Sequence, residues 1–515
     1  MKIFNSLSYI FVGVSSLVIS SCSDSTFTDI NTDPNNPPAV PTTTLIVNAQ
    51  KQAIDAIRSE GINLRGAQLF SQFYAQNIYT DPSRYIIPTS ASDDFWKDSY
   101  LALNNINEIV KLNSDEKTKA IVSAGTAGTN SNQIAIARIL KSFVFHHLTD
   151  VFGNIPYESY GNKDPEFQAL QQNPDNLTPK YAKQEKIYLD ILNELDQAAD
   201  TLYKYQDQNT FGKADVIFQG NNKKWYKFAN SLRLRLATRI LSKSNTIAKQ
   251  HIDDAIAQGV FTSNSDNAVF NYSATSPNQA PLFKATVIAN RKDFAVSNVI
   301  VETLTGKRGP FTTLDPRLAK YSNKNDEDKY VGQPYGLPLE AGNVLPFNKV
   351  SLPGTIVNAA NFGEVLQEYA EVEFLISEYK NWDQDHYVKG VKASLEKWGV
   401  APADYSAYVQ ALPAATQANV LSQKYIALYT QGIEGWTEIR RTGYPKFLVK
   451  KGDLLWKGLV GGVEKSFYFT PEFSDAIPNR LVYPLNEQRT NRNNYQESLA
   501  QQGDDVITTK LWWNK

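Results

Sequence analysis

Residues 184–202 read QEKIYLDILNELDQAADTL, and this stretch decides the class of fold that we expect. Its apolar residues recur at steps of four, four, three and four, at Ile187, Ile191, Leu195, Ala198 and Leu202. Positions at this spacing share one face of an α-helix, because the helix turns once in about 3.6 residues. The sequence therefore predicts an amphipathic helix here that buries one side.

Two other stretches carry the same kind of signal. Residues 365–379 (VLQEYAEVEFLISEY) hold an apolar stripe at helical spacing, which predicts a second amphipathic helix. Residues 223–241 (KKWYKFANSLRLRLATRIL) alternate leucine and arginine in their centre, which is a strand period. Their length and the outer apolar positions favour a helix instead.

The arginines in residues 223–241 require partners. On a helix, Arg233 and Arg235 point roughly 200° apart, so they cannot share one solvent face. At least one of them is expected to lie against protein and to need a carboxylate. We expect Glu371 and Glu373 to act as such ion-pair partners rather than as catalysts.

Helical patterns return in pairs along the chain, separated by long irregular insertions. Further helices are predicted at 44–60, 94–112, 133–152, 383–398 and 421–439, and long loops at 80–92, 262–297, 306–357 and 449–489. This organisation is typical of helix-hairpin repeats of the tetratricopeptide type. We therefore predict a mainly α fold, with a tetratricopeptide-like helix-pair scaffold, long loop insertions and few short strands.

The composition limits the classes of function that the chain can have. The chain has 515 residues, 42% of them hydrophobic and 20% charged, and a formal net charge of −1. An ordinary globular composition of this kind can bury a large core. The balance of charge provides no field to recruit nucleic acid or an anionic membrane surface. Aromatic residues make up 12% of the chain, and they can serve the core, an interface or a sugar-stacking surface.

The single cysteine, Cys22, points to a membrane anchor. A basic start at Lys2 and a short apolar stretch at 9–19 precede it, and the run is too short to span a bilayer. The pattern resembles a lipobox, so residues 1–21 are predicted as a lipoprotein signal peptide and Cys22 as the lipid-bearing residue. The alternative is an ordinary secretory signal with an incidental cysteine.

The organisation that follows is a tether and one domain. Residues 22–44 are dense in Ser, Thr, Asn, Asp and Pro, which predicts a flexible tether after the lipidated cysteine. Residues 45–515 are predicted to form a single helical domain with a loop-borne ligand-binding region. Membrane contact is expected through the lipid alone.

The sequence carries no recognisable enzyme signature. The sequence has no HExxH, GxSxG or Walker-type glycine loop, and His146 and His147 are adjacent, so their rings diverge on a helix. The acidic run 325–328 supplies oxygens for a structural calcium but lacks the spaced pattern of a calcium loop. We expect no catalytic residue, no resident metal and no cofactor.

Several segments together resemble one known family. They are TDVFGNIPY (149–157), PKYAKQEKIYLDILNELDQAADTL (179–202), WYKFANSLRLRLATRIL (225–241), LDPRL (314–318), QKYIALYTQGIEGWTEIRRTG (423–443), PNRLVYP (478–484) and the terminal tryptophans 512–513. In order and combination the chain resembles the SusD/RagB family, and its SusD-like subgroup most. The resemblance implies a helical outer-membrane lipoprotein that faces the outside. It also implies a TonB-dependent transporter of the SusC type as partner, and an oligosaccharide or peptide as ligand.

The loops hold the candidate ligand-binding residues. Aromatic rings can stack on the apolar faces of sugars, and paired charges can hydrogen-bond hydroxyl groups. The candidates are Tyr79, Tyr85, Tyr272, Arg291, Asp293, Phe294 and Tyr335. For each, packing within a loop is the alternative interpretation. By contrast, Trp96, Trp225, Trp436, Arg440 and Arg441 lie in helical segments and are expected to pack or to form ion pairs.

The function that we expect is the capture of a nutrient, a glycan first and a peptide second, and its delivery to the transporter. Two alternatives stay open: a glycan-degrading enzyme of the same uptake system, and a surface adhesin.

Overall fold

The apolar stripe at 184–202 becomes helix α7 (Gln184–Lys204), and all five of its stripe residues are fully buried. The ambiguous stretch at 223–241 becomes helix α8 (Asn222–Arg239), which packs along α7. The Asn221 side chain caps α8 by accepting a hydrogen bond from the Lys224 backbone N–H at 3.0 Å. Both predicted helices are therefore confirmed.

The structure is a computed structural model that describes residues 40–172, 174, 177–341 and 344–515. Residues 1–40 and 41–515 form separate units, and all the described helices and strands belong to the second. The predicted signal peptide, Cys22 and the tether up to residue 39 lie outside the described residues. The predicted end of the tether at residue 44 is wrong, because the first described helix begins at Thr42 and so includes the last three residues of the predicted segment.

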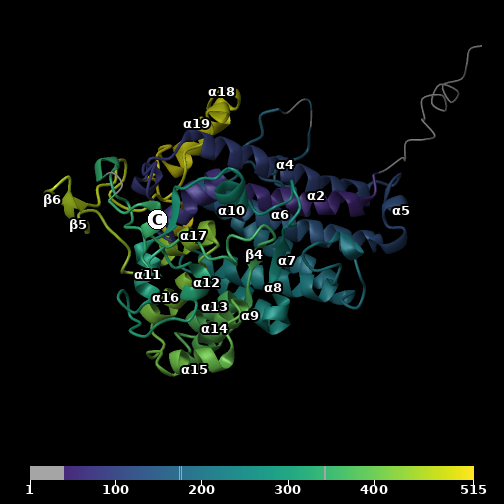
Figure 1. Ribbon diagram of the computed structural model, residues 1–515. Helices are drawn as coiled ribbons and strands as arrows, with labels where there is room; N and C mark the ends of the chain where they lie inside the picture. Colours follow the sequence, from purple (N-terminus) through teal and green to yellow (C-terminus); the bar gives the residue numbers. More distant parts are fainter. Residues whose placement is uncertain (1–39, 173, 175–176, 342–343) are drawn as a thin grey trace, which may run out of the picture. The chain divides into compact units, whose positions relative to one another are not determined.

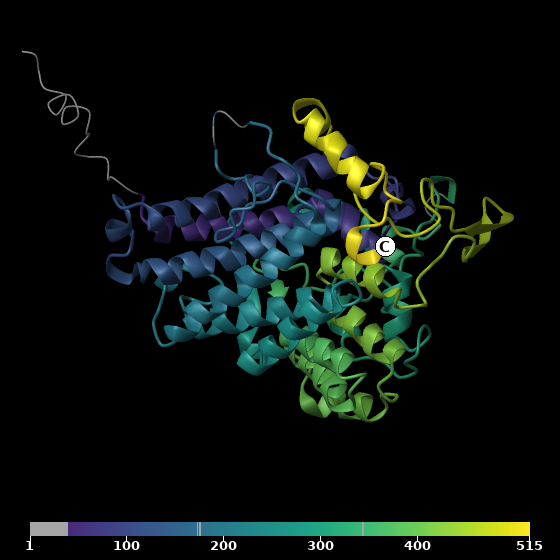
Figure 2. The same cartoon turned by 180° about the vertical axis from the view of Figure 1, so that it is seen from behind.

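Successive helix pairs build the scaffold. The longer helices are α2 (Thr42–Arg58), α4 (Thr89–Ser114), α6 (Asn130–Phe152), α9 (Asn245–Gln258), α13 (Tyr369–Tyr379), α14 (Gln384–Lys397), α15 (Pro402–Gln410), α16 (Gln417–Ala427), α17 (Gly432–Thr442) and α19 (Arg492–Gln502). Each packs on a neighbour: α2 on α4, α4 on α6, α6 on α7, α8 on α9, and α13 on both α14 and α16. Figures 1 and 2 show α2, α4 and α6 side by side from opposite directions. This arrangement confirms the predicted helix-pair architecture.

Short elements occupy the connections. The described strands form antiparallel pairs: β1 (Tyr74–Gln76) with β3 (Phe294–Val296), β2 (Ala268–Asn271) with β4 (Gly363–Gln367), and β5 (Leu454–Val460) with β6 (Val463–Tyr468). The short helices are η1 (Glu60–Ala67), α3 (Gln68–Phe70), η2 (Pro82–Arg84), α5 (Lys119–Val122), η3 (Gly125–Ala127), η4 (Gly212–Ala214), η5 (Asn264–Asp266), α10 (Pro281–Phe283), η6 (Lys284–Ile288), α11 (Asn298–Leu304), α12 (Leu318–Tyr321), η7 (Leu339–Ala341), η8 (Phe347–Lys349), α18 (Leu485–Thr490) and η9 (Trp512–Asn514). The predicted long loops contain most of these elements.

The helix predicted over 365–379 is wrong at its start. Residues 363–367 form strand β4, and the helix begins only at Tyr369. Val365 lies opposite Val269 of β2, a partner about a hundred positions away in the sequence. Pairing with that distant strand overrides the local helical spacing, since β-branched valine also fits a strand.

The helix predicted over 421–439 is wrong in its middle, because α16 ends at Ala427 and α17 begins at Gly432. The break lets α17 approach η1 closely. A Cβ atom on Gly432 would lie 2.6 Å from Asn63 Oδ1 and 2.8 Å from the Gln68 nitrogen. Only glycine fits such an approach of two backbones.

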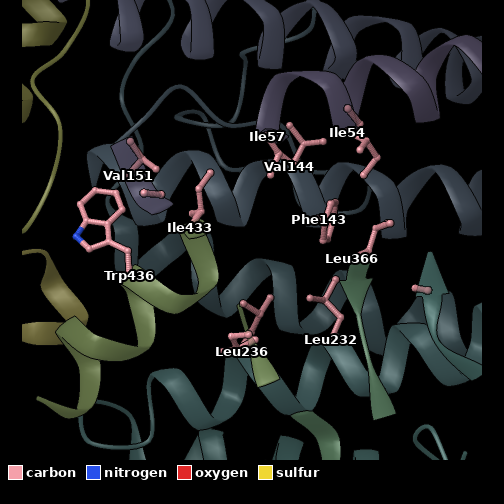
Figure 3. Close-up of a cluster of buried hydrophobic side chains, with 14 of the residues drawn as sticks. Ile54, Ile57, Phe143, Val144, Val151, Leu232, Leu236, Leu366, Ile433 and Trp436 are labelled. Atoms are coloured by element: carbon pink, nitrogen blue, oxygen red, sulfur yellow. The ribbon is translucent and has the colours of Figure 1, made fainter. Parts of the chain in front are cut away.

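The part of the apolar core drawn in Figure 3 lies where four helices and β4 meet. Figure 3 shows side chains from α2, α6, α8, α17 and β4 converging on it: Ile54, Ile57, Phe143, Val144, Val151, Leu232, Leu236, Leu366, Ile433 and Trp436. Each of them is at most 2% exposed. Burial of apolar side chains is the main stabilising force of such a core.

Charged groups are also buried between these helices. Arg235 of α8 donates to Glu371 of α13 from Nε at 2.7 Å and from Nη2 at 2.5 Å. The expected partnership of Arg235 with Glu371 is therefore confirmed. The expectation for Glu373 is wrong, because its carboxylate meets His386 at 2.6 Å. Arg233 instead pairs with Asp196 at 2.7 Å.

Replacement of Glu371 by alanine should destabilise the fold strongly. The substitution leaves the guanidinium of Arg235 buried, and loss of one partner of a buried ion pair costs about 3–5 kcal/mol. Thermal or urea unfolding of Glu371→Ala measures the loss. The matched control is Asp328→Ala, which removes an exposed ion pair with Lys324 and should leave the melting temperature nearly unchanged. An unchanged melting temperature for Glu371→Ala would contradict this account.

Candidate functional site

Two of the predicted loops meet at one end of the β1–β3 pair. Gln76, the last residue of β1, lies opposite Phe294, the first residue of β3. Because the strands are antiparallel, the segment that leaves β1 starts beside the segment that enters β3. The residues after 76 and those before 294 are therefore brought together.

A cavity of about 460 Å³ lies at this junction, which we call the β1–β3 cavity. Its walls come from η1, from the segment after β1 and from the segment before β3: Arg65, Gln76, Tyr79, Asp81, Pro82, Ile86, Ile87, Pro88 and Arg291. The volume lies within the range of roughly 300–1,000 Å³ that is usual for small-molecule sites. The cavity contains two of the seven predicted site residues, Tyr79 and Arg291.

The ring of Tyr79 is exposed to solvent, and its backbone adopts an unfavourable conformation. Tyr79 is 69% exposed, and its φ of 55° is left-handed; Tyr85, in the same loop, has a φ of 70°. A side chain with a Cβ atom pays roughly 1–2 kcal/mol for this conformation. Strained residues of this kind gather at functional sites, so the two angles favour this loop as a binding element.

A chain of ion pairs fixes the arginines of the cavity. Arg291 donates to Asp293 from Nε at 3.0 Å and from Nη2 at 2.6 Å, and its Nη1 lies 3.2 Å from Glu60. The hydrogen bonds that Arg291 donates to Asp293 raise the pKa of the guanidinium above its usual value. Glu60 also accepts from Arg65. The guanidinium of Arg291 further lies 5.6 Å from the ring centre of Phe294.

The remaining charge in the wall is likewise paired. Asp81 accepts from Arg84 at 2.7 Å, and Arg84 also reaches Glu472 at 2.8 Å. Among the described residues, no hydrogen-bond partner faces Arg65 Nε, a buried donor in the cavity wall. The cavity therefore offers an exposed ring and balanced charges, which suits a neutral ligand that carries hydroxyl groups.

The other predicted residues lie behind this surface or away from it. Asp293 and Phe294 are buried and support Arg291. Tyr85 is buried, with its ring centre 5.7 Å from that of Phe469, and Tyr335 is fully buried against the same ring. Tyr272 is buried after β2 and donates from its hydroxyl to Asp55 of α2 at 2.7 Å. Their part in binding stays a prediction.

Sequence reasoning did not identify Arg65, Gln76 and Asp81 as residues of the site. Arg65 belongs to the π-helix η1, and Gln76 ends a strand of three residues. Neither element has a periodic apolar pattern from which it could be predicted. Asp81 lies within the loop predicted at 80–92, between two of the candidate tyrosines, and that position was the only available signal.

The helical tryptophans and arginines serve packing, as expected. Trp225 and Trp436 are fully buried, and the guanidinium of Arg440 lies 3.7 Å from the ring centre of Trp436. Arg441 forms two hydrogen bonds of 2.7 Å with Glu378. Trp96 is buried, with its ring 5.2 Å from that of Phe152. These contacts confirm the structural roles predicted for them.

Groups that often bind metals are engaged within the protein. His146 and His147 are buried, and burial lowers the pKa of both imidazoles well below the usual value. In the acidic run 325–328, Glu327 meets Lys329 and Lys349, and Asp328 meets Lys324. Within the described ranges, no cluster of three or more His, Cys, Asp or Glu side chains is placed to hold a metal. In the same ranges, no helix is both long and apolar enough to cross a bilayer.

Comparison with known proteins identifies relatives over nearly the whole chain. The family model SusD-like_2, described as starch-binding and associating with the outer membrane, matches residues 34–457. A second model, described as SusD and RagB outer membrane lipoprotein, matches residues 416–514. No curated protein matches the chain.

Solved structures have the same fold. A chitin-binding protein is 25% identical with a TM-score of 0.72, and the match covers 92% of this chain and 99% of that one. A SusD homologue from Bacteroides uniformis is 23% identical, with the same TM-score and coverage. A chitin-binding SusD homologue from Flavobacterium johnsoniae is 22% identical with a TM-score of 0.70, over 91% of this chain and 98% of that one.

The two tyrosines of the loop should respond oppositely to substitution. Tyr79→Gly removes an exposed ring and relieves a left-handed backbone, so we expect the free energy of unfolding to stay equal or to rise by about 1 kcal/mol. Tyr85→Ala empties a buried position and should cost about 3–5 kcal/mol. Denaturant unfolding of both variants measures the difference. A large loss of stability in Tyr79→Gly would show that its ring packs against the protein.

Proposed function

The chain belongs to the SusD-like family of outer-membrane proteins, and on this premise we propose that it binds a glycan at the β1–β3 cavity and delivers it to a SusC-like TonB-dependent transporter. The family assignment makes it a nutrient-binding outer-membrane protein. The observation that carries the choice of a glycan is the solvent-exposed ring of Tyr79 beside paired arginines and carboxylates.

The chemistry of the cavity favours a neutral, polyhydroxylated ligand. The Tyr79 ring offers a flat face for the C–H surface of a sugar, as aromatic side chains generally do for apolar surfaces. The rim of the Arg291–Asp293 pair can hydrogen-bond hydroxyl groups. The relatives described as chitin-binding support a glycan over a peptide.

The carboxylates around the cavity support binding rather than hydrolysis. Glycoside hydrolysis uses two carboxyl groups on either side of the scissile bond, one of them a proton donor. Here Glu60, Asp81 and Asp293 each accept hydrogen bonds from an arginine. We therefore assign these groups to holding the arginines in place and propose no catalytic role for them.

Attachment and delivery complete the proposal. A lipid on Cys22 would hold the domain at the outer face of the outer membrane, and the description of the matching family as lipoproteins supports this. The polar segment from Cys22 to the start of α2 at Thr42 would serve as the tether. In this arrangement the receptor stays beside its transporter while its loops take up ligand.

Binding assays on a panel of soluble oligosaccharides from chitin, starch and xylan test the ligand. We expect one of them to bind by calorimetry without the appearance of new reducing ends. Tyr79→Ala should weaken that binding on the order of tenfold, or about 1.4 kcal/mol. The matched control is Tyr203→Ala, which removes a 56% exposed ring from α7 and should leave the affinity unchanged. Release of reducing ends by the pure protein would instead establish a hydrolase.

Fractionation of membranes tests the anchor and the partner. The wild-type protein should enter the detergent phase, and Cys22→Ala should move it to the aqueous phase because the diacylglycerol is lost. A gentle detergent extract should also carry a large TonB-dependent barrel together with the wild-type protein. Detergent partitioning of Cys22→Ala would refute the lipid anchor, and absence of the barrel would favour an adhesin.

A further inference from the structure

A second cavity, of about 410 Å³, adjoins the β1–β3 cavity, and we call it the C-terminal cavity. The two share Ile87 and Pro88 in their walls, so the same short stretch of chain separates them. The rest of the wall contains Tyr85, Phe473 and apolar residues from two segments near the C-terminus, which include Leu481 and Ile507.

The walls of the two cavities differ in chemistry. The β1–β3 cavity contains two arginines and an aspartate, whereas the C-terminal cavity contains one charged group, Asp505. That carboxylate is occupied within the protein. It lies 3.0 Å from Arg480 and accepts from the Tyr483 backbone N–H at 3.1 Å and from the Tyr495 hydroxyl at 3.0 Å. What the C-terminal cavity offers to a ligand is therefore mainly carbon surface.

Large apolar side chains at its rim remain exposed. Phe473 is 68% exposed and Val506 is 46% exposed, although both line the cavity. Covering such surface with an apolar group is favourable at roughly 25 cal/mol per Å². The cavity is also large enough for a ring, since a dry apolar cavity of about 150 Å³ suffices to bind benzene.

We infer that the C-terminal cavity receives an apolar acyl or aryl substituent of the saccharide that binds in the β1–β3 cavity. The inference rests on the proposed function, because it assigns the class of glycan that the site takes. The shared wall at Ile87 and Pro88 carries it, together with the fall from three charged side chains in the β1–β3 cavity to one in the C-terminal cavity. The ligand is then a substituted saccharide with one polar and one apolar part.

The test compares the methyl and phenyl β-glycosides of diacetylchitobiose as probes in titration calorimetry. The wild-type protein should bind the phenyl glycoside on the order of tenfold more tightly. Val506→Trp fills the cavity from its exposed rim, so the two affinities should become equal while that of the methyl glycoside is unchanged. Phe473→Ala removes exposed apolar surface from the rim and should likewise reduce the preference for the phenyl over the methyl glycoside.

A tryptophan placed elsewhere provides the matched control. Ile247→Trp introduces the same ring at a 42% exposed position of α9 and should keep the tenfold ratio. Equal affinities in the wild-type protein would overturn the inference and leave the proposed function standing. Retention of the ratio in Val506→Trp would also overturn it, because the phenyl group would then bind elsewhere.

If neither glycoside binds, the proposed function fails for this saccharide and a sugar-free probe decides the inference. Toluene should then bind to the wild-type protein, as observed by NMR shifts of the side chains around Leu481, and not to Val506→Trp. Absence of toluene binding to the wild-type protein would overturn the inference.

Discussion

A buried cluster of guanidinium and carboxylate groups constrains how the helices fit together. Arg239 of α8 lies 2.7 Å from Asp150 of α6 and also meets Glu434 of α17, while the neighbouring Arg235 holds Glu371 of α13. None of these groups is more than 2% exposed. A charge without a partner is very costly in such a place. Since a slip of one helical turn moves a side chain by about 5.4 Å, only one alignment of the four helices keeps every charge paired.

The same alignment positions the candidate site. Next to the cluster, Arg58 at the end of α2 donates to the Val365 carbonyl oxygen and pairs with Glu364, so the end of α2 is tied to β4. Directly after it, η1 provides Arg65 to the cavity wall and Glu60 as the partner of Arg65 and Arg291. On its other side, η1 contacts α17 at Gly432. Arg65 of the cavity wall thus belongs to an element that directly follows the buried Arg58 and is held in place by it.

How far the sequence predicts this molecule depends on whether a feature is local. The helices α7 and α8 follow from spacing within their own residues, and Glu371 follows from the need of Arg235 for a partner. Strand β4 and the break before Gly432 do not, because a distant strand and a close backbone approach decide them. The sequence predicts the loops that form the site. It does not predict whether a tyrosine in such a loop is exposed or buried. Tyr79 and Tyr85 show this, and only tertiary packing separates them.

The exposure of Tyr79 has a consequence for how this receptor can evolve. Its ring is exposed to solvent, so under the proposed function a substitution at this position would alter the ligand that is bound without disturbing the packed core. The loop residues can then change with the available nutrient, while the residues of the helical scaffold change slowly. We therefore expect paralogues that share this fold and bind different ligands.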